Sequence, residues 1–202
     1  MYVRDAKNRE EVWLLDHIEA MGLDEQAFRS RDYVVAIDEA SNAKAGFGRI
    51  RIHKASGDDG DSDSEGGDRE VCELTSIGVL EGWREQGVGA HVVERLVRTA
   101  DDEGFETAYA LTDEPNYLAQ FGFEAIEEGD LPDVLARRLA EKRDALAPDA
   151  IPMRLRVAEF RMPERLRERF KVAAETHEPE PEETPEDFGI DTDSATYKYD
   201  TG

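Results

Sequence analysis

The stretch from Val71 to Ala100 constrains the fold more than any other part of the chain. It begins with the apolar run Val71–Val79, whose β-branched content and short length are typical of a buried strand. A loop over residues 80–90 follows. Apolar residues then return at the spacing of one helix face, at Val88, Val92, Val93, Leu96, Val97 and Ala100. The predicted order is therefore strand, glycine-containing loop, helix.

This loop is suited to holding an anion. A helix leaves the N–H groups of its first turn without partners inside the helix, and its dipole favours negative charge at that end. Gly87 and Gly89 lack side chains that would block a close approach of the backbone. The spacing has neither the third glycine of a dinucleotide fingerprint nor the Gly-Lys-Ser/Thr ending of a P-loop, so neither of those sites is expected.

The motif resembles that of a known enzyme family. Arg84, Gly87, Gly89 and Ala90 fit Arg-x-x-Gly-x-Gly/Ala, and a strand at 107–112 and the segment Gln120-Phe121-Gly122-Phe123 follow. This order resembles the GNAT family of acetyl-CoA-dependent N-acetyltransferases over roughly residues 1–157, most specifically over 71–123. The resemblance implies the α/β (α+β) GNAT fold: helices flanking a mixed, mostly antiparallel sheet of about six to seven strands with a V-shaped splay.

The resemblance also implies which residues hold acetyl-CoA as co-substrate. The backbone of Ile77, Gly78 and Val79 would pair with the pantetheine arm as an added strand does and would polarise the thioester. The pyrophosphate would lie on the amides of Arg84, Glu85, Gln86, Gly87, Val88, Gly89 and Ala90. Core packing is the alternative for the side chains of Ile77 and Val79, and the two roles are compatible because one uses backbone and the other side chain.

Two residues are candidates for proton transfer. Glu73 stands where many family members carry a glutamate and would act as general base, directly or through a water; the alternative is a solvated strand residue. Many members place a tyrosine four residues before the glycine of Gly-Phe, where this chain has Leu118, and Tyr117 lies one place earlier. Tyr117 is the candidate general acid, and water is its alternative.

The acceptor is expected to be a primary amine of a small molecule such as an amino acid. Leu131-Pro132 and Ala150–Met153 resemble GNAT members that acetylate α-amino groups. A bidentate arginine could hold the carboxylate of such a substrate. The nearby cations are Arg137, Arg138, Lys142, Arg143, Arg154 and Arg156. Protein lysines or N-termini are an alternative substrate class, and a non-catalytic coenzyme A-binding or interaction module is an alternative function.

The charge is extreme, with a formal net value of −23 from 48 acidic and 25 basic residues. Such a surface indicates a halophilic cytoplasmic protein, because concentrated salt screens the self-repulsion. It argues against nucleic-acid binding, since phosphates would be repelled. No apolar run reaches membrane-spanning length and no signal peptide is visible. A small-molecule amine is the expected partner, and a homodimer is an option for assembly.

The single cysteine, Cys72, excludes an internal disulfide and a multi-cysteine metal site. An acyl-accepting nucleophile is one interpretation of Cys72, and a small buried core residue is the favoured one. No metal is expected.

The acidic segment at 56–69 is predicted to be a mobile loop, since it cannot bury apolar surface. A calcium loop is its alternative, but the EF-hand spacing is not satisfied.

The remaining periodicity predicts the other elements. Strands are expected at 1–4, 33–38, 45–53, 123–126 and 151–157, and helices at 9–21, 24–31, 117–121, 131–146 and 163–174. Val12, Leu15 and Ile18 define the expected apolar side of the first helix. In domain terms, residues 1–157 form the acetyltransferase domain, 158–174 an additional C-terminal helix and 175–202 an acidic, flexible tail.

Overall fold

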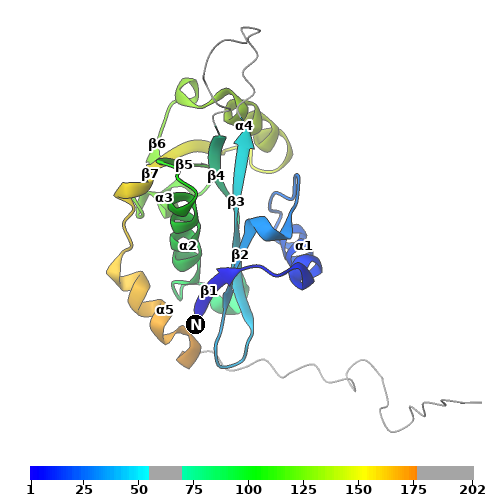
Figure 1. Ribbon diagram of the computed structural model, residues 1–202, viewed down its shortest axis with the longest axis vertical. Coiled ribbons are helices and arrows are strands. Elements are labelled where there is room, and N and C mark those ends of the chain that lie inside the picture. The colour runs from blue at the N-terminus through cyan, green and yellow to red at the C-terminus, as the bar shows by residue number, and fades with distance from the viewer. Residues whose placement is uncertain (55–69, 177–202) are drawn as a thin grey trace, which may run out of the picture.

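The computed structural model describes residues 1–54 and 70–176 (Figure 1). The predictions for the acidic loop at 56–69, its calcium alternative, and the tail from residue 177 onward therefore lie outside the described residues. Within 1–54 and 70–176, no helix is long and apolar enough to cross a membrane. In the same two ranges, no group of three or more His, Cys, Asp and Glu residues is placed to hold a metal ion.

The centre of the molecule is a seven-stranded sheet in the order β1-β2-β3-β4-β5-β7-β6. The strands are β1 (Tyr2–Asp5), β2 (Tyr33–Ile37), β3 (Lys44–Lys54), β4 (Glu70–Val79), β5 (Thr107–Thr112), β6 (Glu124–Ala125) and β7 (Ile151–Arg156). β4 and β5 run parallel, and the other neighbouring pairs are antiparallel. The predicted mixed, mostly antiparallel sheet is confirmed.

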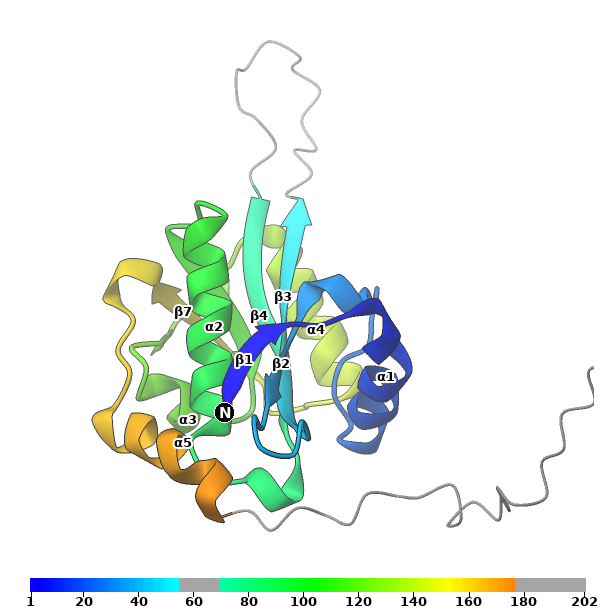
Figure 2. The same ribbon diagram turned by 60° about the horizontal axis from the view of Figure 1, so that its bottom comes forward.

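Helices cover both faces of the sheet, as Figures 1 and 2 show. They are α1 (Glu11–Ala20), α2 (Val88–Asp102), α3 (Pro115–Ala119), α4 (Asp133–Ala145) and α5 (Glu164–Thr176). α2 packs on one face and is in contact with α5, while α1 and α4 lie on the other face. The largest apolar cluster lies under α2, and smaller clusters lie under α1 and α4.

The two central strands part at one end, as the resemblance implied. β4 pairs with β5 only at Cys72–Ala108 and Glu73–Tyr109, although β4 continues to Val79 and β5 to Thr112. The register of β3 against β4 shifts between Phe47 and Arg49, and Ser76 on β4 has a φ of 48°. Such a bulge bends a strand away from its neighbour, so the backbone beyond Ser76 is free of β5.

Glycines on β3 let α2 approach the sheet closely. The sequence left one face of this strand nearly bare, at Gly46 and Gly48. A Cβ on Gly48 would lie 2.6 Å from Val92 and 2.9 Å from Leu96, both on α2. The bare face is therefore filled by α2, which seats the start of that helix beside the parted strands.

The predicted apolar face of the first helix was correct at Ile18 and wrong at Val12. Val12 is 70% exposed, whereas Leu14 and Ile18 are fully buried against the sheet. The helix also begins two residues later than predicted, after a 3₁₀ turn at Asn8–Glu10. Glu10 receives a bidentate ion pair from Arg4 of β1, and this pair fixes how the chain enters α1.

The helix predicted at 24–31 is absent from the structure, which has turns and a 3₁₀ helix at Ser30–Asp32 instead. Ala27 has a φ of 50°, outside helical geometry. The carbonyl oxygens of Gln26 and Ala27 accept hydrogen bonds from the buried guanidinium of Arg49. Those two carbonyls therefore serve a buried charge, which an α-helix over this segment would prevent.

The helix α4 begins at Asp133 and ends at Ala145, inside the predicted 131–146. Leu135 and Leu139 are buried, but Leu146, just after the helix, is 43% exposed. Arg138, one of the cations considered for a substrate carboxylate, is buried. The buried side of α4 therefore carries charge toward the sheet.

Candidate active site

The loop before α2 has the geometry expected of an anion site. Gly87 caps α2 in the left-handed conformation, with a φ of 79°. The first intrahelical bond of the helix runs from the amide of His91 to the carbonyl of Gly87, so the amides of Val88 to Ala90 belong to the first turn, which lacks intrahelical acceptors. The positive end of the α2 dipole and its free N–H groups thus lie at the opening between the parted strands β4 and β5.

Helix α5 braces this loop from behind. A Cβ on Gly87 would lie 2.3 Å from the carbonyl oxygen of Leu166, so only glycine allows the contact. The guanidinium of Arg169 donates to the carbonyl oxygen of Glu85, which has a φ of 62°. His91 stacks on Phe170 with ring centroids 3.7 Å apart. The unusual backbone of the loop is therefore held by a helix whose role the sequence did not reveal.

A cavity of ≈ 510 Å³ opens where β4 and β5 separate. Ile77 and Val79 of β4, Arg84 of the loop and Gly89 of α2 line one side. Residues 110–114 at the end of β5 and Leu118 line the other. The cavity thus runs from the start of α2 into the wedge between the strands.

Tyr117 reaches this cavity from α3. Its hydroxyl would lie 2.6 Å from a Cβ on Gly89, so the glycine makes room for it. Burial raises the pKa of Tyr117 to about 12. The phenol therefore stays protonated at neutral pH and can donate a hydrogen bond into the cavity.

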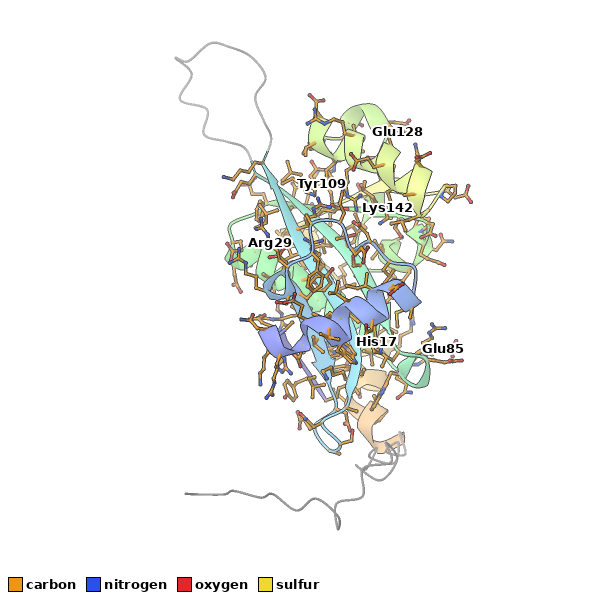
Figure 3. All side chains as sticks on the ribbon, turned by 90° about the vertical axis from the view of Figure 1, so that its right-hand side faces the viewer. His17, Arg29, Glu85, Tyr109, Glu128 and Lys142 are labelled. Atoms are coloured by element: carbon orange, nitrogen blue, oxygen red, sulfur yellow. The ribbon has the colours of Figure 1, made fainter. Side chains whose placement is uncertain are left out.

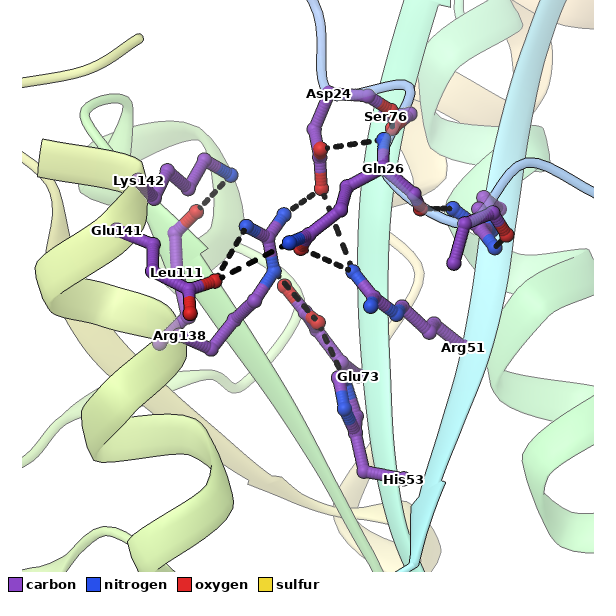
Figure 4. Close-up of polar contacts among 12 residues, drawn as sticks. Asp24, Gln26, Arg51, His53, Glu73, Ser76, Leu111, Arg138, Glu141 and Lys142 are labelled. Carbon is purple, nitrogen blue, oxygen red and sulfur yellow. Dashed lines mark hydrogen bonds and ion pairs between the residues drawn. The ribbon is translucent and has the colours of Figure 1, made fainter. Parts of the chain in front are cut away.

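Beside the cavity lies a buried ionic cluster that joins four elements (Figure 4). Arg138 of α4 pairs with Asp24, and its Nε lies 3.9 Å from Oε2 of Glu73. That same Glu73 oxygen is 2.7 Å from Nε2 of His53 on β3. Glu73 is fully buried and Arg138 is 5% exposed. Desolvation lowers the pKa of Arg138, so the neighbouring carboxylates are needed to keep this charge inside the protein.

Lys142 lies where two cavities meet. It lines the ≈ 510 Å³ cavity and also a second one of ≈ 690 Å³, which Arg138 and Asp24 line as well. Its ammonium donates to the carbonyl oxygen of Leu111, 2.6 Å away, and burial lowers its pKa. Figure 3 shows Lys142 on the α4 side of the sheet, at a distance from Glu85 in the glycine loop.

Comparison with protein-family models identifies the family. Residues 3–123, more than half of the chain, match the model of the acetyltransferase (GNAT) family. The chain belongs to the GNAT family. The match ends before α4, β7 and α5, so the brace behind the glycine loop and the Arg138 side of the cluster lie beyond the matched residues.

This GNAT chain is similar to a curated N-acetyltransferase over part of its length. An uncharacterized N-acetyltransferase of Chlorobaculum tepidum is 27% identical over 84 residues, which are 42% of this chain and 54% of that relative. The match thus spans about half the length of the curated relative.

Solved structures show the same GNAT fold. N-acetylglutamate synthase of Neisseria gonorrhoeae, complexed with coenzyme A and N-acetyl-glutamate, matches with a TM-score of 0.58 and 15% identity over 77% of this chain and 34% of its own. The protein Rv2747 of Mycobacterium tuberculosis, in complex with CoA and NLQ, matches with a TM-score of 0.58 and 15% identity over 77% of this chain and 98% of its own. At this identity the likeness is one of fold.

The GNAT fold brings five of the twelve predicted site residues to the wall of one cavity. Ile77, Val79, Arg84, Gly89 and Tyr117 all line the ≈ 510 Å³ cavity. Gly78 faces the other side of β4, where a Cβ would lie 2.7 Å from Phe47. Glu73 is on the same strand but does not line the cavity. Cys72 is fully buried, and burial raises its pKa to about 12, as expected of a core residue.

Sequence reasoning missed Asp24 and Thr75 and did not separate Arg138 and Lys142 from the other cations of this GNAT chain. A signal was present for the two cations. Arg138 and Lys142 follow Leu135 by three and seven residues, so they share the apolar side of α4. For Thr75 the signal was its place two residues after Glu73, on the same face of β4 before the bulge.

Proposed function

We propose that this GNAT protein is an acetyl-CoA-dependent N-acetyltransferase that acetylates the primary amine of a small, carboxylate-bearing molecule such as an amino acid. The observation that carries the proposal is the ≈ 510 Å³ cavity between the parted ends of β4 and β5, directly beside the glycine-capped start of α2. Family membership supports the reaction class, and the residues around the cavity fit its chemistry.

Acetyl-CoA would supply the acetyl group as an activated thioester. The free backbone of Ile77, Gly78 and Val79, beyond the last pairing with β5, would hold the pantetheine arm as an added strand. The amides from Arg84 to Ala90 would hold the pyrophosphate, since the helix start offers both donors and positive dipole. Arg84 lines the cavity next to this loop and adds positive charge beside the proposed pyrophosphate site.

Glu73 and Tyr117 would move the protons. Glu73 is the general base; because its carboxylate does not line the cavity, it would act through an intervening group such as a water. Tyr117 would protonate the departing thiolate, since its hydroxyl lines the cavity and burial keeps it protonated.

Lys142 supports an acceptor with a carboxylate. Of the six cations singled out in the sequence, Lys142 lines the ≈ 510 Å³ cavity, and it bonds a backbone carbonyl rather than an acid. Arg143 and Arg156 pair with Glu128 and Glu159, and Arg138 belongs to the buried cluster. The Neisseria protein was complexed with N-acetyl-glutamate, but its 15% identity speaks for the fold alone, so the acceptor class rests on Lys142.

The test is release of free thiol from acetyl-CoA with a panel of amines, run in concentrated potassium chloride. Free amino acids should be acetylated, and the same amino acids as amides should react at least tenfold less well, because an amide cannot pair with Lys142. A Lys142→Met variant should lose this preference, whereas Lys171→Met, an exposed lysine on α5, should keep it. Turnover of peptides alone would assign a protein substrate, and binding of acetyl-CoA without turnover would leave a coenzyme-binding module.

The role of Glu73 needs a separate experiment. Glu73→Gln should bind acetyl-CoA as the wild type does but turn over at least 100-fold more slowly. Because Glu73 also pairs with His53, folding of the variant must be checked by circular dichroism. Unchanged turnover at every pH would remove Glu73 from the mechanism.

A further inference from the structure

Thr75 places a hydroxyl at the wall of the cavity without a partner. The residue is 4% exposed and lines the ≈ 510 Å³ cavity. Among the residues that the structure describes, its Oγ1 has no hydrogen-bond partner. The adjacent hydroxyl of Ser76 differs, because it donates to the carbonyl oxygen of Asp24 over 2.6 Å. The strand thus satisfies one of two neighbouring hydroxyls and leaves the other, on a residue that lines the cavity, without a partner among the described residues.

A buried hydroxyl without a partner lowers the stability of the folded protein unless a further group forms a hydrogen bond with it. A buried hydroxyl that has lost water without gaining a partner destabilises a protein. Valine has nearly the shape of threonine and would fill the position without that cost. The hydroxyl of Thr75 is therefore best explained by a ligand that enters the cavity and completes its hydrogen bonds.

Glu73 is placed to accept a proton that passes through Thr75. It precedes Thr75 by two residues, and before the bulge at Ser76 such residues share one face of the strand. Its Oε2 bonds His53, whereas its Oε1 is buried and has no hydrogen-bond partner among the described residues. Two residues along a strand are roughly 6.6 Å apart, a span that one water can bridge.

We propose that the Thr75 hydroxyl contacts the acceptor amine and relays its proton to Glu73. This inference rests on the proposed acetyltransferase function. The acceptor ammonium gives one proton to the Thr75 oxygen as Thr75 passes its own hydroxyl proton, through a water, to Oε1 of Glu73. One N–H bond breaks, one O–H bond forms on Glu73, and Thr75 ends unchanged. The freed nitrogen lone pair forms the new N–C bond at the thioester carbonyl, the C–S bond breaks, and the departing sulfur takes a proton from Tyr117. The nitrogen then gives up its second proton, which returns to the Tyr117 oxygen, so that the products are a neutral amide, a free thiol and protonated Glu73.

The relay is tested with Thr75→Val, which removes the hydroxyl at nearly constant shape, and Thr75→Ser, which keeps it. With acetyl-CoA and the best amine of the panel, kcat of Thr75→Val should fall at least tenfold while the KM for acetyl-CoA stays within twofold. Thr75→Ser should stay within threefold of the wild type. Thr99→Val is the matched control, because that hydroxyl bonds the carbonyl of Arg95 on α2 and should leave kcat unchanged.

Thermal unfolding provides a readout independent of turnover. Thr75→Val should unfold at a higher temperature than the wild type, because it removes an unpaired buried hydroxyl. Thr99→Val should not. Because the relay water enters with the acceptor, a fall of several degrees for Thr75→Val would show that the hydroxyl is already bonded in the resting protein and would overturn the proposal.

The turnover measurements also separate a failure of the relay from a failure of the proposed acetyltransferase function. Unchanged kcat in Thr75→Val, or equal losses in the valine and serine variants, overturns the relay while leaving the acetyltransferase function in place. A wild type that turns over no amine overturns both. If Thr75→Val does not fold, Thr75→Ala takes its place, and its kcat must fall at least tenfold relative to Thr75→Ser for the relay to stand.

Discussion

The two ends of the cavity are built in different ways. At the coenzyme end the recognition elements are backbone amides, glycines and the start of α2, all within residues 77–90. On the proposed acceptor side, the cavity is flanked by a cluster of ionisable side chains from four distant parts of the chain: Asp24, His53, Glu73 and Arg138. The first end depends on backbone shape, and the second on compensation of buried charge. Substitutions should therefore separate the two ends by the kind of damage they cause.

The largest effect is expected at the acceptor end, from Arg138→Met. Removing this guanidinium leaves the buried Glu73 without its guanidinium neighbour and leaves Asp24 only the 3.8 Å contact with Arg51. We expect the free energy of unfolding to fall by about 3–5 kcal/mol, the usual cost of breaking a buried ion pair. Urea unfolding at constant high salt measures it. Arg137→Met, at the exposed neighbouring position, should change stability by less than about 0.5 kcal/mol, and equal losses in both would contradict a special role for the cluster.

A smaller effect, confined to the coenzyme end, is expected from Gly87→Ala. The alanine would have to keep the left-handed backbone of residue 87, and its Cβ would meet the carbonyl oxygen of Leu166. These two effects should lower the free energy of unfolding by about 2–3 kcal/mol and weaken acetyl-CoA binding. Gly104→Ala is the matched control, because its φ is 83° but nothing lies within 4 Å of its Cβ position. That variant should lose only about 1 kcal/mol and bind normally. Equal binding losses in both variants would rule out the α5 contact as the cause.

The features that could be predicted from the sequence depend on residues that are close together in the chain, whereas the others depend on residues that are far apart in it. β4, the glycine loop and α2 follow one another, so local periodicity and helix-start physics were sufficient. The ionic cluster joins residues up to 114 positions apart, from Asp24 to Arg138, and no local pattern pairs them. The turns at 24–31 were misjudged for the same reason, because the bonds that hold them come from Arg49 on β3. The brace by α5 was hidden because its helix follows the motif by more than 70 residues.

A further prediction concerns Tyr117, which connects the two ends. Tyr117→Phe should lower kcat roughly tenfold, less than a full general acid contributes, because water can also protonate the thiolate. Burial raises the pKa of the hydroxyl to about 12, so Tyr117 stays protonated below that value and should cause no fall in rate between pH 8 and pH 10. A rate that declines through pH 9 in the wild type but not in Tyr117→Phe would contradict this assignment.

The smallest effect is expected at Cys72, which is fully buried in the core of the sheet. Burial raises its pKa to about 12, so the thiol should resist alkylation by iodoacetamide in the folded protein and react only after unfolding. Cys72→Ala should change kcat by less than twofold. Rapid alkylation with loss of activity would instead revive the interpretation of Cys72 as a nucleophile.

The central claim is that the start of α2 and the parted strands β4 and β5 hold coenzyme A. Isothermal titration calorimetry of the full chain with coenzyme A, in concentrated potassium chloride, tests this claim most directly. We predict saturable binding of one coenzyme per chain, weakened in Gly87→Ala and unchanged in Gly104→Ala. No heat of association at any salt concentration with a protein that is folded by circular dichroism would contradict it.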